Sequence, residues 1–121
     1  MIKIIKENGI YSIMESSESK KIEKFAKNLG ADLILIDSNN IELSKIVVPK
    51  EARGTGIGSK IMKEIIKYAD SVNKIVTLTP SKDFGGSVPK LIKFYKSFGF
   101  VENKGKNKDY EISDTMYRLP K

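Results

Sequence analysis

Hydrophobic residues follow two periods along the chain, and the places where one period replaces the other outline the fold. Apolar positions spaced three and four residues apart form one face of an α-helix. This spacing predicts a helix that ends at Gly30, a second helix over about residues 57–70, and a third that carries Tyr95 and ends at Gly99. Glycine commonly follows a helix C-terminus because it adopts the left-handed conformation without strain.

Short apolar runs bounded by turn residues predict β-strands between these helices. Asn8-Gly9 separates two such runs and predicts a tight hairpin. The expected strands cover residues 2–5, 10–14, 33–36, 41–48, 74–79, 100–101 and 112–119. The resulting order, β-β-α-β-β-α-β-α-β-β, predicts a mixed α/β layer fold. The length of 121 residues fits a single domain over residues 1–121.

Composition narrows the possible chemistry. The chain contains no cysteine and no histidine, which excludes disulfides, thiol catalysis and the commonest general base. No carboxylates cluster at the spacing of metal ligands, so we expect no metal site. No apolar run reaches the length of a membrane span and no signal-peptide pattern opens the chain, so we expect a cytoplasmic protein. The net charge of +7 favours an anionic partner, either a cofactor with several phosphates or a nucleic acid.

The most informative segment joins the strand that ends at Val48 to the helix that begins near Ile57. Between them lies a glycine-rich turn with one cation, Arg53. The amides of such a turn and the dipole of the following helix attract a phosphate, and glycine lets the ligand approach the backbone. We therefore expect this segment to bind a phosphorylated cofactor.

Two common phosphate-binding motifs do not fit this turn. The dinucleotide-binding fingerprint needs Gly-x-Gly-x-x-Gly, but the third glycine, Gly58, comes one residue early. The P-loop requires Gly-Lys-Ser/Thr, whereas the chain reads Gly58-Ser59-Lys60.

Two other patterns do match a known family. Arg53-x-x-Gly56-x-Gly58, preceded by Leu43-x-x-Ile46-x-Val48, resembles the acyl-CoA pyrophosphate loop of the GNAT-type N-acetyltransferases. At the expected distance, Leu91-Ile-Lys-Phe-Tyr-Lys-Ser-Phe-Gly-Phe100 is similar to the family's helix that carries a tyrosine and ends in Gly-Phe. The resemblance covers roughly residues 41–101. It implies a central, mixed and splayed β-sheet with helices on both faces.

The resemblance also implies an activity, the direct transfer of the acetyl group of acetyl-CoA to an amine without a metal. It implies that backbone amides of the turn hold the diphosphate. The end of the preceding strand is implied to hold the pantetheine arm and to donate to the thioester oxygen. The residues concerned are Ile46, Val47 and Val48 in the strand and Arg53, Gly54, Thr55, Gly56, Ile57, Gly58 and Ser59 in the turn and helix start.

Two side chains are candidates for the proton transfers. Tyr95 is the candidate acid, because a phenol with a reference pKa of ~10 stays protonated and can donate to a departing thiolate, whose pKa is ~8.5. An ordinary core tyrosine is the alternative interpretation. Glu42, on the strand that leads into the cofactor site, is implied by the resemblance as a base that acts through water. Strand alternation can instead turn Glu42 to the other face, and water or the neutral amine then suffices.

The acceptor is left open by the sequence. A small amine, a protein amine and an amino group on nucleic acid are the alternatives, and no membrane partner is expected. The basic turn Asn103–Lys108, with Phe84, Tyr110 and Tyr117, is the feature that favours nucleic acid, but a solvated turn is the preferred interpretation, and a small-molecule or protein amine ranks ahead of nucleic acid as the acceptor. Val88 stands where family members commonly place an asparagine that contacts the pantetheine.

A non-catalytic module that binds acyl-CoA or nucleic acid on the same fold is the second hypothesis for the function. Tyr95 argues against this hypothesis, because a protein that only binds has no need of an acid for a leaving group. The sequence allows either a monomer or a homodimer.

Overall fold

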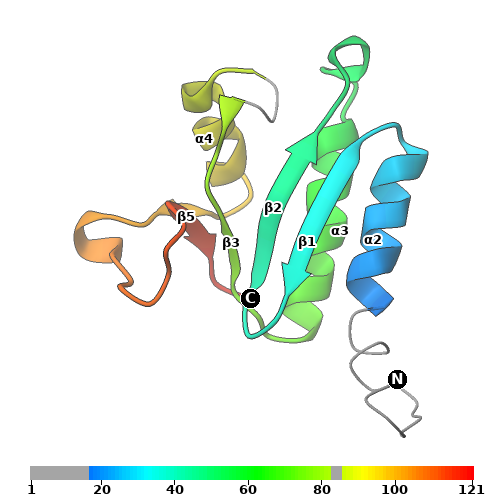
Figure 1. Ribbon diagram of the computed structural model, residues 1–121. Coiled ribbons are helices and arrows are strands. Elements are labelled where there is room, and N and C mark those ends of the chain that lie inside the picture. The colour runs from blue at the N-terminus through cyan, green and yellow to red at the C-terminus, as the bar shows by residue number, and fades with distance from the viewer. Residues whose placement is uncertain (1–16, 83–85) are drawn as a thin grey trace, which may run out of the picture.

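The computed structural model describes residues 17–82 and 86–121. The hairpin predicted around Asn8-Gly9 and the side chain of Phe84 therefore lie outside the described residues. The described part is a mixed α/β fold with an open sheet, as the order of elements predicts (Figure 1).

Within residues 17–82 and 86–121, five strands form the sheet, in the order β1-β2-β3-β5-β4. Only β2 and β3 run parallel among the described strands, and the other neighbours are antiparallel. Their bounds are β1 Asp32–Asp37, β2 Ile41–Val47, β3 Val76–Leu78, β4 Val101–Glu102 and β5 Met116–Arg118. This mixture of directions follows from the connections, because the helix between β2 and β3 is the crossover that a parallel pair requires.

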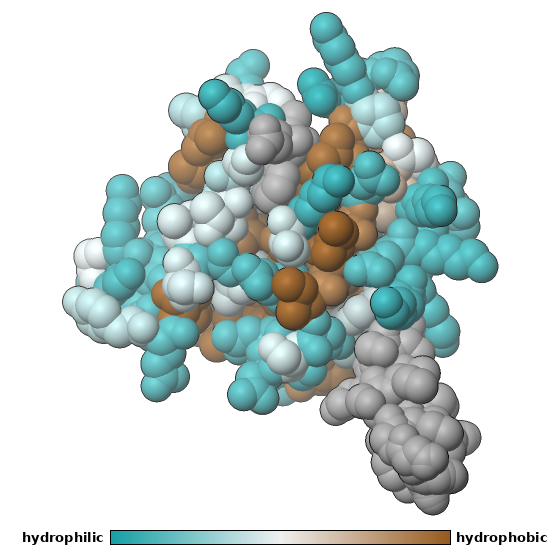
Figure 2. Space-filling model, viewed as in Figure 1, coloured by the Kyte–Doolittle hydropathy of each residue, from teal (hydrophilic) through white to brown (hydrophobic). Residues whose placement is uncertain are grey.

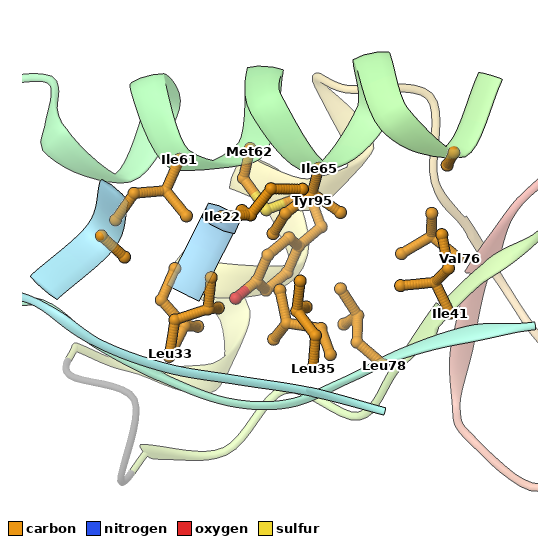
Figure 3. Close-up of a cluster of buried hydrophobic side chains, with 14 of the residues drawn as sticks. Ile22, Leu33, Leu35, Ile41, Ile61, Met62, Ile65, Val76, Leu78 and Tyr95 are labelled. Carbon is orange, nitrogen blue, oxygen red and sulfur yellow. The ribbon is translucent and has the colours of Figure 1, made fainter. Parts of the chain in front are cut away.

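The α-helices in the described residues that cover the sheet are α2 Ser17–Asn28, α3 Ile57–Ser71 and α4 Val88–Lys96. Alternate strand residues, such as Leu33 and Leu35 in β1, share one core with Ile61 and Ile65 of α3. Tyr95 of α4 belongs to the same core and lies between α3 and the strands in Figure 3. The described helices thus gather on one face of the sheet, whereas the resemblance implied helices on both faces.

The sheet opens between its two parallel strands. β2 and β3 pair only from Ile41–Val76 to Leu43–Leu78, and the two strands diverge beyond that point in Figure 1. A β-bulge interrupts β2 at the same level, since Ile34 pairs with Lys45 and Leu35 pairs with Leu43, which leaves Ser44 without a partner in β1. Bulges commonly redirect a strand beside an active site. The splay that the resemblance implies is therefore present.

One acidic side chain ties the helices to the sheet. The carboxylate of Asp37, at the end of β1, accepts hydrogen bonds from Ser19 of α2, Tyr68 of α3 and Lys74. Burial raises the pKa of Asp37, but these hydrogen bonds outweigh burial and hold the pKa below its usual value. The hydroxyl of Ser19 thus serves a tertiary contact between α2 and β1.

The closing strand is shorter than its sequence predicts. The pattern predicts a strand over residues 112–119, but β5 covers only Met116–Arg118. The buried side chain of Asn103 explains the difference, because its amide donates to the backbone oxygens of Asp109, Ile112 and Asp114. The backbone N–H of Asp109 donates in turn to the Asn103 side-chain oxygen, at 2.7 Å. Carbonyls used in this way hold a compact loop instead of a strand.

Candidate active site

A cavity of about 350 Å³ lies between the start of α3, the end of β2 and the side of α4. We call it the amide cavity. It is lined by Ile46, Val48, Ala52, Arg53, Gly54, Gly56, Ile57, Gly58, Ser59, Leu91, Phe94 and Tyr95. The structure thus brings together most of the residues expected to bind the cofactor with the expected acid. Val47 and Thr55 do not line this cavity.

The glycine turn presents unpaired amides to the cavity. Gly54 and Gly56 adopt φ angles of 83° and 87°, which favour glycine, and Gly56 is the residue that caps the fifteen-residue helix α3. In the described part of the chain, no acceptor is found for the backbone N–H groups of Gly54, Gly56, Ile57, Gly58 and Ser59. Unpaired amides at the positive end of a helix dipole form a binding site for an anion.

Two side-chain hydrogen bonds stabilise the conformation of the glycine turn without using its backbone amides. The Arg53 side chain donates from Nε to the carbonyl oxygen of Val48 at 3.1 Å, which leaves its terminal nitrogens available beside the turn. The hydroxyl of Thr55 donates to the carbonyl oxygen of Ala52. Thr55 therefore contributes to the conformation of the turn, while its neighbours line the cavity.

Tyr95 is buried with no hydrogen bond to its hydroxyl from the described residues. The side chain is 1% exposed, and its ring makes edge contacts with Phe94 and Phe100 at centroid distances of 5.3 and 5.8 Å. Among residues 17–82 and 86–121 no side chain or backbone group pairs with the phenolic oxygen, which is unusual for a buried polar atom. Burial raises the pKa of Tyr95 above its ordinary value, so the hydroxyl is a proton donor at neutral pH.

Glu42 is not in the amide cavity. Its side chain lies on the face of β2 that points away from the core, and it lines a second, smaller hollow of about 210 Å³. We call this hollow the acidic pocket. Its lining consists of Ile36, Ser38, Asn39, Asn40, Glu42, Thr77, Glu111, Ile112, Ser113 and Asp114. The alternation of the strand separates Glu42 from Tyr95, so the two candidate proton-transfer groups lie on opposite faces of the sheet.

Glu42 shares the acidic pocket with a second carboxyl group that the sequence did not indicate. Burial and the adjacent carboxylate of Asp114, which is also hydrogen-bonded to Glu42, raise the pKa of Glu42. Asp114 also accepts a hydrogen bond from the hydroxyl of Thr79, at 2.7 Å. Nothing in the spacing of Glu42 and Asp114 along the chain signals this contact, because residues far apart in sequence meet here only through the sheet.

The lysines of the basic turn are exposed, but two of them also contact neighbouring side chains. Lys104 pairs with Glu102 at 3.5 Å, and the ammonium group of Lys108 lies 5.4 Å from the centre of the Tyr110 ring. Tyr117 is buried, with its hydroxyl donating to the carbonyl oxygen of Asn107. Of the aromatic side chains considered for nucleic-acid binding, only Tyr110 is exposed in the described residues.

Two other kinds of site are absent from the described part of the chain. No group of three or more histidine, cysteine, aspartate or glutamate residues in residues 17–82 and 86–121 could hold a metal ion. None of the helices in these same ranges is long and apolar enough to cross a membrane.

Known proteins share both the sequence pattern and the fold. Residues 10–102 match the model of the acetyltransferase (GNAT) domain. A crystal structure of an acetyltransferase of the GNAT family from Staphylococcus aureus Mu50 superposes with a TM-score of 0.51 and 22% identity, over 88% of this chain and 78% of that one. At this identity the superposition shows a shared fold and nothing about the acceptor.

A longer relative is known from Methanocaldococcus jannaschii, under the name "Putative precorrin-2 dehydrogenase". It is 32% identical over 112 residues, which make up 87% of this chain and 53% of that protein. The chain therefore spans about half the length of this relative. Because the family model covers most of the chain, including the glycine turn and the Tyr95 helix, the protein belongs to the family of GNAT acetyltransferase domains.

Proposed function

We propose that the protein transfers the acetyl group of acetyl-CoA to the nitrogen of an amine. The observation that carries this proposal is a cavity lined both by the unpaired amides of the glycine turn and by Tyr95, whose hydroxyl has no partner among the described residues. The amides of Gly56 to Ser59 would bind the diphosphate. The apolar side chains of Ile46 and Val48 would contact the pantetheine arm, which the opening between β2 and β3 admits.

The chemistry needs two proton transfers. The amine nitrogen bonds to the thioester carbonyl carbon, the carbon–sulfur bond then breaks, and the thiolate takes the phenolic proton of Tyr95. The proton that the nitrogen loses as the amide forms would restore the Tyr95 phenol. Tyr95 is protonated at neutral pH and can therefore donate when the thiolate leaves, although burial, which raises its pKa, also makes it a weaker acid. An amine is mostly protonated at neutral pH, so a base must first remove one of its protons.

Glu42 is proposed as this base, acting through water. Ser44, the unpaired residue at which β2 leaves β3, follows Glu42 by two positions, about 7 Å along an extended strand. A bridging water would connect an amine near Ser44 to the carboxylate of Glu42. The raised pKa of Glu42 brings the carboxylate closer to the basicity that proton removal requires.

Release of free thiol from acetyl-CoA in the presence of a panel of amines tests the proposal. We expect thiol release that depends on the amine, with one acetylated amine formed for each thiol. Tight binding of acetyl-CoA in calorimetry without acetylation of any amine would instead favour the non-catalytic binding module.

A further inference from the structure

The acidic pocket concentrates negative charge on the face of the sheet turned toward the viewer in Figures 1 and 2, away from α2 and α3. Three carboxyl groups line it, those of Glu42, Glu111 and Asp114. No lysine or arginine is found among its lining residues in the described part of the chain. In a protein with a net charge of +7, a pocket of this composition selects for a cationic ligand.

An unpaired hydroxyl points to a ligand independently of the charge. Thr77 of β3 lines the acidic pocket and is 5% exposed. It pairs in register with Glu42, while its neighbours Val76 and Leu78 face the core, so its side chain lies on the Glu42 side of the sheet. Its hydroxyl has no hydrogen-bond partner among residues 17–82 and 86–121. A buried hydroxyl without a partner is costly, and a donor in the pocket would satisfy it.

The loop that carries two of these carboxyl groups is fixed in position. Asn103 holds residues 109–114 through hydrogen bonds to three of their carbonyl oxygens and to the Asp109 amide. The hydroxyl of Thr79 donates to Asp114 and accepts from the Thr115 amide, which fixes the Asp114 side chain against β3. The carboxylates are thus preorganised, which lowers the entropy lost when a ligand binds.

The pocket lies beside the opening through which an acceptor would reach the thioester. Glu42 and Thr77 are in the short stretch where β2 and β3 still pair, and the strands separate immediately after Leu43 and Leu78. A primary ammonium group has three N–H donors and no acceptor, and it matches two carboxylates and a hydroxyl. A divalent metal ion fits less well, since no metal-binding group is found in the described residues.

We propose that the acidic pocket binds a second ammonium group of the acceptor, which is therefore a small, flexible aliphatic diamine or polyamine. This inference rests on the proposed function and names its substrate class. One amino group would lie at the opening near Ser44, and the other would lie between Asp114, Glu111 and the Thr77 hydroxyl. The acceptor would thus need two charges separated by a short aliphatic chain.

A matched pair of amines tests the proposal. Acetyl transfer to 1,4-diaminobutane and to n-butylamine differs only in the second ammonium group. We expect kcat/KM to be about 10-fold or more higher for the diamine, the usual effect of one charge-assisted hydrogen bond. Asp114→Asn and Thr77→Val should reduce this preference several-fold. The control Glu18→Gln, which removes a carboxylate on exposed α2, should leave the preference intact.

Equal use of the two amines would overturn the inference while leaving the proposed function in place. So would a preference that survives both Asp114→Asn and Thr77→Val, or a higher kcat/KM for a lysine-containing peptide than for the diamine. If no amine is acetylated, the pocket is tested by calorimetry with 1,4-diaminobutane alone. If the wild type binds 1,4-diaminobutane and Asp114→Asn weakens this binding, the ammonium site is supported even though the proposed function has failed. If the wild type does not bind 1,4-diaminobutane, the inference of an ammonium site is overturned.

Discussion

The two hollows on opposite faces of the sheet are built in different ways. The amide cavity takes most of its lining from one continuous segment, residues 46–59, and offers backbone N–H groups among apolar side chains. The acidic pocket takes its lining from residues 36–42, 77 and 111–114, which are far apart in the chain, and offers side-chain oxygen atoms. The amide cavity thus offers backbone N–H groups to a ligand, whereas the acidic pocket depends on the identity of particular side chains.

This difference determines how each site responds to substitution. A backbone site depends on conformation and on the absence of side chains, so substitution of a glycine should damage it most. A side-chain site depends on several residues far apart in sequence and on the contacts that fix their loop. Each single substitution should therefore weaken ligand binding only in part. The two sites should therefore be separable by mutation.

The largest effect is expected in the amide cavity. Gly58→Asp places a carboxylate against the site of the diphosphate, and its Cβ would lie 3.5 Å from the ring of Phe94. We expect acetyl-CoA binding to become undetectable in calorimetry, and Gly56→Asp to act in the same way. Gly105→Asp is the control, because it adds the same charge at an exposed turn outside both hollows. Retained affinity in both cavity variants would contradict the assignment of the glycine turn.

The next largest effect concerns the acid. Tyr95→Phe removes only the unpaired hydroxyl and keeps the packed ring, so we expect kcat to fall by ~10²–10⁴-fold. Affinity for acetyl-CoA should hardly change. Tyr110→Phe is the matched control, since Tyr110 is 88% exposed and should tolerate the loss. An unaltered turnover rate for Tyr95→Phe would assign this residue to packing.

A smaller effect is expected for Asn103, which holds the loop of the acidic pocket and does not line the amide cavity. Asn103→Ala leaves the buried carbonyls of the 109–114 loop without their donor, and we expect a loss of about 2–3 kcal/mol in the free energy of unfolding by urea. The selectivity for the diamine should decline, while the affinity for acetyl-CoA stays. Asn107→Ala, at an exposed position nearby, should change the unfolding midpoint little. Equal losses in the two variants would show that Asn103 does not organise the loop.

The smallest effect is a displacement of the pH profile. If Glu42 is the base, kcat/KM falls on the acid side as pH drops through its raised pKa, because the protonated carboxyl group cannot accept a proton. Asp114→Asn removes the neighbouring negative charge, so the pKa of Glu42 should fall and the acid limb should move to lower pH. A limb that stays in place would exclude Glu42 from proton removal.

The sequence anticipates the amide cavity better than the acidic pocket for a physical reason. The glycines, Arg53 and the strand before them are neighbours in the chain, so their joint geometry follows from local conformation. A local signal for the bulge at Ser44 also exists, because the apolar residues Leu43 and Ile46 are three positions apart in a strand whose period is two. Thr77 and Asp114, by contrast, have no local pattern that connects them to Glu42.

The sequence by itself determined the mixed α/β fold, the glycine turn at the start of α3 and the helix that carries Tyr95. Each depends on hydrophobic periodicity or on turn chemistry within a few residues. Only the tertiary structure decided that Glu42 and Tyr95 face opposite sides of the sheet, and that Asn103 replaces part of the last strand with a loop. These outcomes depend on strand register and on hydrogen bonds between distant segments, which no local pattern encodes.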